Sequence, residues 1–349
     1  MKISFRIMFG IFITALFMSG CAQKVKIKAL QPAEVEEMAT KKKIAISSFK
    51  NDKYGLSGKI ESQIAKHKLD QKRYFTVVSR KDLDKIMAEQ RLQSSELMDE
   101  TTATRVGKLI GAQAVINGEI ASASGESGKY RKDAKECLNY TKNGCTKWRY
   151  YKVTCHTTKA SVSANINIVN VETGSIIYGD TISKEYSADS CRPIISDYFS
   201  LGSSTAILSK GQALNRLTTE IASEFVYKLT PNYIYFEVAL LDDIELDNVT
   251  QEQEDIFEYS LEYIKAGRMD KAEQMLQELL DELDGKSYVV AYVYGVVQEA
   301  EGKLNDAKKA YTLADDLTLG PVEEINSALR RIDNLIEKKE RAKRQMNAK

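Results

Sequence analysis

Strand-like and helix-like segments alternate along the chain from Lys41 onward. Runs rich in β-branched and aromatic residues predict strands, and they occupy residues 42–49, 74–79 and 112–123. Segments with apolar residues every three or four positions predict helices with one buried face, and they occupy residues 55–69, 80–92 and 101–111. Gly111 is placed to cap the last of these helices.

A hairpin and a long helix complete the first half of the pattern. Apolar and polar residues alternate over residues 160–187, and Gly174 marks the turn between two strands. Apolar positions at helical spacing then predict a helix from Ser204 to Leu229, which Pro231 ends. We therefore expect one α+β domain over residues 41–235, in which helices cover a mixed sheet.

A repeated pattern begins near Gln251. The segment "AGRMDKAEQML" (266–276) aligns with "EGKLNDAKKAY" (301–311) at an offset of 35 residues, a period typical of stacked helical pairs. The positions that carry the repeat are Gly267, Ala272, Gly302 and Ala307. The segment resembles the tetratricopeptide repeat, and this resemblance implies an all-α array in which a small alanine lets paired helices lie close. An apolar stripe after Pro321 predicts a capping helix.

The first residues have the layout of an export signal. Lys2 and Arg6 precede an apolar run over residues 7–17, which is shorter than the about 20 residues of a membrane-spanning helix. The following "MSGC" resembles the lipobox of bacterial lipoproteins. That resemblance implies cleavage before Cys21 and acylation of this cysteine, so we expect a lipid-anchored protein on the outer membrane that faces the periplasm.

These signals divide the chain into five expected parts. They are a signal peptide over residues 1–20, a lipidated tether over 21–40, the α+β domain over 41–235 with an insert at 124–159, an acidic linker over 236–253, and the repeat array over 254–349. Asp242, Asp243, Glu245 and Asp247 within the linker are interpreted as solvated residues rather than a cation site.

Charge and motifs limit the function. The 50 Lys and Arg balance 49 Asp and Glu, for a formal net charge of +1, which argues against nucleic acid as a partner. The sequence has no hydrolase elbow, phosphate loop, dinucleotide fingerprint or metal-ligand spacing. We expect no catalytic residue, no metal and no cofactor, and therefore a protein that is not an enzyme.

Four cysteines follow Cys21. An even number in an exported chain predicts two disulfides with three pairings open, and the four are Cys137, Cys145, Cys155 and Cys191. Their spacings lack the C-x-x-C pairs of a compact zinc site, so metal binding and free thiols are the less favoured alternatives.

Three stretches resemble the curli-assembly (CsgG-like) lipoprotein family in their order and spacing. They are "FTVVSRKDLDKIMAEQRLQSSEL" (75–97), "VGKLIGAQAVINGEIASA" (106–123) and "ANINIVNVETGSIIYGDTISKEY" (164–186). The resemblance implies a mixed-sheet domain with covering helices. The best-known member of the family is a ring-shaped outer-membrane secretion channel, in which two hairpins of each subunit span the membrane.

Neither hairpin site of this chain has the expected sequence. The insert at 124–159 carries many Lys and Arg without apolar alternation, and Pro193 and Asp197 interrupt the second site. Charges on a lipid-facing strand cost about 2–4 kcal/mol each near the membrane midplane. We therefore expect the insert to fold as a disulfide-stabilised periplasmic loop.

The functional hypothesis is a non-enzymatic, lipid-anchored scaffold that recruits envelope or secretion proteins through its CsgG-like and repeat domains. Homo-oligomers fit this hypothesis. Two alternatives stay open: a subunit of a CsgG-type secretion channel, and a lipoprotein that activates a cell-wall synthase.

Overall fold

The computed structural model describes residues 23–348 except residues 79, 91, 93–98, 143 and 192–206. The predicted signal peptide and Cys21 lie outside the described residues. The described chain divides into two compact units. The α/β unit holds Pro32–Asn232 and the end of the chain from Lys343, and the helical unit holds the strand before Pro32 and Tyr233–Ala342.

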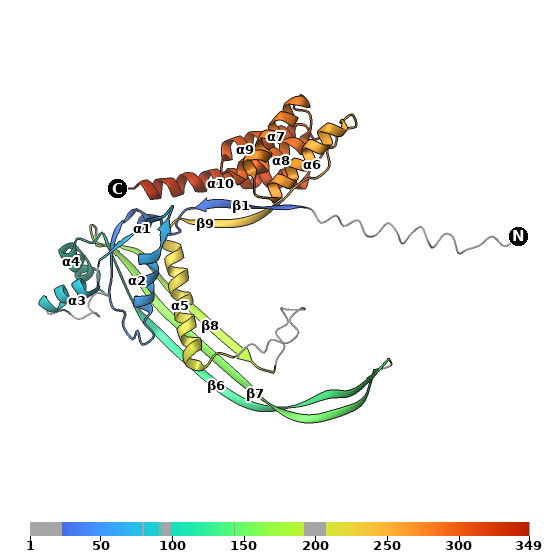
Figure 1. The fold of residues 1–349 in the computed structure, drawn as a ribbon. Helices are drawn as coiled ribbons and strands as arrows, with labels where there is room; N and C mark the ends of the chain where they lie inside the picture. The colour runs from blue at the N-terminus through green and yellow to red at the C-terminus, as the bar shows by residue number, and fades with distance from the viewer. Residues whose placement is uncertain are drawn as a thin grey trace. The chain divides into compact units, whose positions relative to one another are not determined.

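A five-stranded mixed sheet is the centre of the α/β unit (Figure 1). Its strands lie in the order β5 (Thr76–Val77), β2 (Lys43–Ile46), β6 (Ala114–Thr141), β7 (Gly144–Asn170) and β8 (Ile176–Asp189). β2 runs parallel to β5 and β6, while β6, β7 and β8 are antiparallel. A separate short pair joins β3 (Lys68–Leu69) to β4 (Lys72–Arg73).

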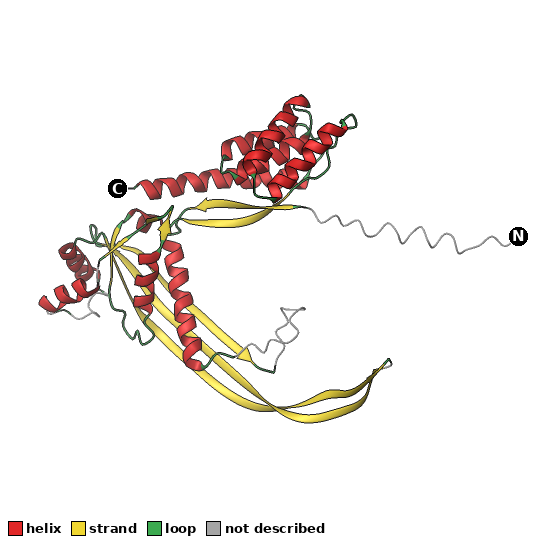
Figure 2. Cartoon of the chain, in the orientation of Figure 1, coloured by secondary structure: helices red, strands yellow, loops and turns green. Residues whose placement is uncertain are grey.

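Helices cover both faces of this sheet (Figure 2). α2 (Leu56–Lys66) and α5 (Lys210–Leu229) pack on one face, while α3 (Arg80–Glu89) and α4 (Glu100–Ile110) pack on the other. The short α1 (Glu36–Thr40) contacts α5. Strand residues alternate between the two cores because successive side chains point to opposite faces: Val115 contacts the α3–α4 side. The predicted α+β class is confirmed.

Five helices form the helical unit. They are α6 (Gln251–Lys265), α7 (Met269–Glu282), α8 (Tyr288–Ala300), α9 (Leu304–Asp316) and α10 (Glu323–Asn347). α8 is apolar on nearly all sides, and Val290, Val293 and Val297 have no exposed surface, as expected of a central helix. The predicted all-α array is confirmed.

Two segments predicted as connections are strands. β1 (Lys24–Gln31) lies within the expected tether, and β9 (Asn232–Ala239) begins before the expected linker. The two strands pair, and the buried residues Val25, Ile27 and Val238 belong to the core of the helical unit. In β1, apolar residues alternate with lysines, the pattern of a strand with one buried face.

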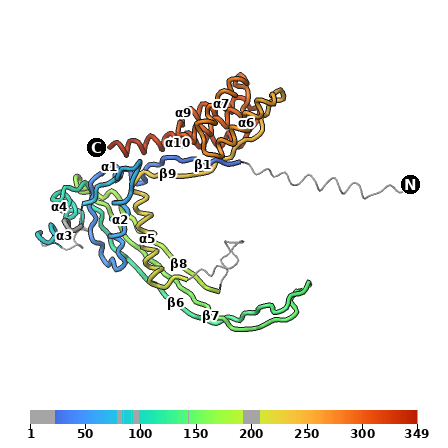
Figure 3. Tube along the Cα trace, in the orientation of Figure 1, coloured from blue at the N-terminus to red at the C-terminus, as the bar shows by residue number. Residues whose placement is uncertain are grey.

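The insert is not a loop, and this prediction is wrong. β6 and β7 continue through residues 124–159 as one antiparallel hairpin, with only local bulges (Figure 3). β8 pairs with β7 only as far as Thr157. The part of the hairpin beyond that point, residues 129–142 and 144–156, is called the arm. At about 3.4 Å per residue, each strand of the arm spans about 40 Å.

Candidate functional site

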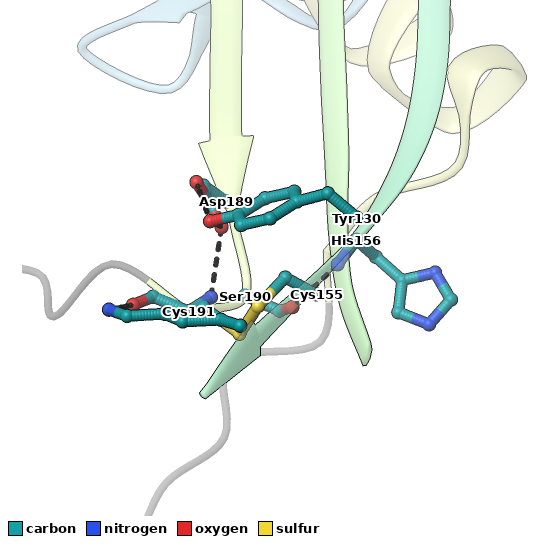
Figure 4. The surroundings of a disulfide bond; sticks show 7 residues. Tyr130, Cys155, His156, Asp189, Ser190 and Cys191 are labelled. Atoms are coloured by element: carbon teal, nitrogen blue, oxygen red, sulfur yellow. Dashed lines mark hydrogen bonds between the residues drawn. A yellow bond between two sulfur atoms is a disulfide. The ribbon is translucent and has the colours of Figure 1, made fainter. Parts of the chain in front are cut away.

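The base of the arm is fixed to the end of β8 (Figure 4). A disulfide joins Cys155, which has no exposed surface, to Cys191, with their Cα atoms 5.4 Å apart. Next to it, the Tyr130 hydroxyl donates to both Asp189 carboxylate oxygens at 3.1 and 2.9 Å. One of these oxygens also accepts from the Cys191 backbone N–H at 2.9 Å. This network joins the three strands where the arm begins.

A second disulfide closes the tip. Cys137 and Cys145 are linked across the turn, with their Cα atoms 5.8 Å apart. The Thr141 hydroxyl donates to the Gly144 carbonyl at 3.0 Å within the same turn. Sequence reasoning left three pairings open, and the strand register selects this one because it places Cys137 and Cys145 on facing strands near the turn.

The surface of the arm combines positive charge with aromatic rings. Residues 129–156 contain eight Lys and Arg but only two Asp and Glu. The side chains of Tyr140 and Tyr150 are 79% and 74% exposed, and Trp148 is also exposed. Lys135 Nζ lies 4.5 Å from the Trp148 ring centroid, a cation–π contact. The aromatic side chains are large and rigid, and they give the arm a large exposed area for contact with another molecule.

Many of these basic and aromatic side chains lie on one face of the arm. Lys135 pairs in register with Tyr150, and Asp133 pairs with Lys152. Because alternate residues share a face, these side chains lie on the same side as Trp148. The exposed residues Arg131, Lys135, Trp148, Tyr150 and Lys152 are called the basic–aromatic face.

The helical unit has its own open surface between α6 and α7. A groove of about 600 Å³ is lined by Tyr259, Glu262, Tyr263, Ala266, Lys271, Gln274, Met275 and Glu278. The segment Gln251–Glu282 contains ten Asp and Glu but only three Lys and Arg. The α6–α7 groove therefore lies between two helices with an excess of acidic residues, and its own lining contains two glutamates, one lysine and two tyrosines.

The predicted repeat positions lie in two helical pairs, Gly267 and Ala272 in the α6–α7 pair that forms this groove, and Gly302 and Ala307 in the α8–α9 pair. Gly267 and Gly302 adopt φ values of 75° and 76° in the turns between paired helices, the left-handed region that glycine enters without strain. Ala272 and Ala307 have no exposed surface. These four residues act through packing and turn geometry, and the groove residues Ala266 and Lys271 are the sequence neighbours of Gly267 and Ala272.

Sequence reasoning missed a close contact at Gly295. A Cβ atom at this position in α8 would lie 2.7 Å from ring atoms of Tyr311, so only glycine lets the ring pack there. The signal available was a lone glycine in the apolar run "YVVAYVYGVV".

The predicted acidic linker contains a helix cap. The Glu245 carboxylate accepts hydrogen bonds from the Ser287 hydroxyl at 2.8 Å and from the Tyr288 backbone N–H at the start of α8.

Within the described ranges, His, Cys, Asp and Glu side chains form no group that could hold a metal ion. The helices of the described chain include none long and apolar enough to span a membrane.

Three solved structures are similar to part of this chain. Among solved structures, the LpoB C-terminal domain from Salmonella enterica is 13% identical, with 44% of this chain and 95% of that chain covered and a TM-score of 0.27. Lipoprotein GNA1162 from Neisseria meningitidis is 14% identical, with 42% and 84% covered and a TM-score of 0.26. The PelC dodecamer from Paraburkholderia phytofirmans is 11% identical, with 59% and 97% covered and a TM-score of 0.24.

The family assignment rests on a family model. No curated protein matches the chain. The model described as "Curli production assembly/transport component CsgG" matches residues 24–232. This match includes the mixed sheet, the helices on both of its faces and the whole arm, and it spans more than half of the sequence. The chain therefore belongs to the CsgG family of curli production assembly/transport components.

Proposed function

We propose that this chain is a non-enzymatic assembly scaffold of the bacterial outer membrane, anchored by lipid on Cys21 and facing the periplasm. The main support is that one chain has two separate exposed surfaces with the composition of binding sites, the arm and the α6–α7 groove. A protein that carries two such surfaces on a tether gathers partners through effective concentration.

The helical unit supports recruitment in particular. Its Gly–Ala signature recurs at an offset of 35 residues, and its helices pair through buried alanines. We propose that this unit is a tetratricopeptide-like array. Arrays of this kind present extended surfaces to partner segments, and a helix or an extended peptide of an envelope or secretion protein would be bound in this way.

The tether and the scaffold can be tested together in cells. We expect the mature protein to begin at an acylated Cys21, to fractionate with the outer membrane, and to cross-link into complexes that contain other envelope proteins. Cys21→Ala should release it from the membrane and reduce these complexes, while Ala22→Ser serves as the matched control. An unmodified Cys21, or a protein that cross-links to no other protein, would contradict the proposal.

A secretion-channel subunit is the second candidate. The observation that favours it is the arm itself, because a hairpin replaces the loop expected at the first hairpin site. Lys and Arg lie on both faces of the arm, which weighs against lipid contact at about 2–4 kcal/mol per charge near the midplane. Bilayer conductance of the purified lipoprotein separates the two candidates. The synthase-activator alternative stays a prediction, to be tested by peptidoglycan synthesis in a deletion strain.

A further inference from the structure

We propose that the arm of one copy binds the α6–α7 groove of a second copy of this chain. This inference rests on the proposed scaffold function and deepens it, because it names a partner for both surfaces. The partner is identified by its charge and by its exposed rings, and both surfaces are among the described residues.

Charge complementarity is the first argument. The arm has eight Lys and Arg against two Asp and Glu, whereas Gln251–Glu282 has ten Asp and Glu against three Lys and Arg. The whole chain has a formal net charge of only +1. Two surfaces with opposite excess charge on a nearly neutral molecule steer copies together and favour one orientation.

The apolar parts of the two surfaces also match. The groove wall contains Tyr259, Tyr263 and Met275, and the basic–aromatic face carries Trp148 and Tyr150. Methionine adapts to aromatic rings and attracts them through its sulfur. Exposed Trp and Tyr side chains are the residues that most often anchor protein interfaces.

The arm is cross-linked at both ends before it binds. Two disulfides hold its base and its tip, and Tyr130 and Asp189 bridge β6 to β8. Lys135 already stacks on Trp148. A surface ordered in advance loses little conformational entropy on association, which favours binding.

The contact joins two different surfaces and is therefore head-to-tail. Each copy would offer one arm and one groove, so the same contact can be repeated from copy to copy. Head-to-tail contacts close into rings when the rotation between copies allows it, and otherwise extend as filaments. The scaffold would then present many copies of its other surfaces.

Charge reversal tests the contact on both sides. We expect light scattering of the intact lipoprotein in mild detergent to show oligomers at low salt that dissociate as salt rises. Lys135→Glu with Lys152→Glu should weaken self-association at least tenfold, and so should Glu262→Lys with Glu278→Lys. The chain carrying all four changes should recover at least half of the lost association. Lys66→Glu with Lys72→Glu, exposed residues of the α/β unit, is the matched control and should associate normally.

Trp148 supplies an independent signal, because it is the only tryptophan of the sequence. Its emission should shift to the blue as the protein concentration rises, and this shift should be absent in the Glu262→Lys, Glu278→Lys chain.

A monomer at all salt concentrations overturns the proposal. So does a chain with all four substitutions that self-associates as weakly as the chains with either pair alone. So does an unchanged mass in the arm variant accompanied by lost binding to vesicles containing phosphatidylglycerol, because the arm would then bind anionic lipid. If a reversal pair melts below the parent, Lys135→Gln with Lys152→Gln replaces it, and a tenfold loss is again expected. These outcomes concern one purified protein, so they are distinguishable from the cellular complexes that test the scaffold function.

Discussion

The carboxylate of Glu299 accepts hydrogen bonds of 2.8 Å from both Nε and an Nη atom of Arg331. The Glu299 side chain has no exposed surface. A third bond of 2.6 Å comes from the Tyr311 hydroxyl. The three residues belong to α8, α10 and α9, so this network joins the last three helices of the helical unit. Burial opposes the charge on Arg331, but its bonds to Glu299 outweigh this effect and raise its pKa.

Breaking this pair should destabilise the helical unit strongly. Arg331→Met leaves the buried carboxylate without its counter-charge, which costs about 3–5 kcal/mol. The measurement is the free energy of unfolding from urea titrations followed by circular dichroism. The neighbouring exposed Arg330 is the control, and Arg330→Met should change stability by less than about 0.5 kcal/mol. Equal losses in the two variants would contradict the buried pair.

Gly295 should not tolerate a methyl group. The new Cβ of Gly295→Ala would meet the Tyr311 ring at 2.7 Å, and the hydrogen bond to Glu299 restrains this ring. Overpacking of this kind costs about 1–3 kcal/mol, which equals or exceeds the about 1 kcal/mol gained in helix propensity. Gly211 in α5 has no heavy atom within 4 Å of its ideal Cβ, so Gly211→Ala should be neutral or stabilising in the same melting experiment. Stabilisation by both substitutions would show that the ring moves freely.

The two disulfides should differ in their effect on stability. Cys155 and Cys191 are 36 residues apart in sequence, and Cys137 and Cys145 are 8 apart. In the chain-entropy model, the first disulfide stabilises the folded state by about 4 kcal/mol and the second by about 2.5 kcal/mol. Replacing Cys155 and Cys191 by serine should therefore lower the melting temperature more than the same change at the tip. The reverse order in thermal melts would contradict this account of the arm.

Alkaline pH should weaken the helical unit. Burial raises the pKa values of Tyr292 and Tyr311 above the ordinary value, while the unfolded chain ionises near pH 10. The stabilisation from these neutral hydroxyls is complete below about pH 10 and falls as the pH rises, by at most about 1.4 kcal/mol per pH unit for each tyrosine.

Urea titrations at stepped pH check this slope. Tyr311→Phe should reduce the decline of the unfolding free energy above about pH 10. Tyr259→Phe, at an exposed site, should leave the decline unchanged. A decline of the same steepness in all three proteins would assign it to other groups.

Helices and strands could be predicted from the sequence wherever one of their faces is buried. Alternation over residues 160–187 predicted the β7–β8 hairpin, and the repeated glycines predicted the turns of the helical unit. The arm could not be found in this way. Both faces of its two strands are solvated, so neither face needs apolar residues and the alternation that marks a half-buried strand is absent.

The candidate site was predictable only in its components. The four disulfide cysteines were identified, but their pairing depends on strand register, which the spacing of seven and nine residues between the first three does not determine. The α6–α7 groove combines residues of two helices whose exposed tyrosines resemble ordinary surface positions. The buried Glu299 also gave no signal, because its partner Arg331 lies 32 residues away.

Native mass spectrometry of the complex taken from the outer membrane, without reducing agent, tests the scaffold account most directly. The account predicts that the chain leaves the membrane bound to at least one other envelope protein, begins at an acylated Cys21 and is lighter by four hydrogens because of two disulfides. A chain bound to no other protein, one that retains the first 20 residues, or one that carries free thiols would contradict it.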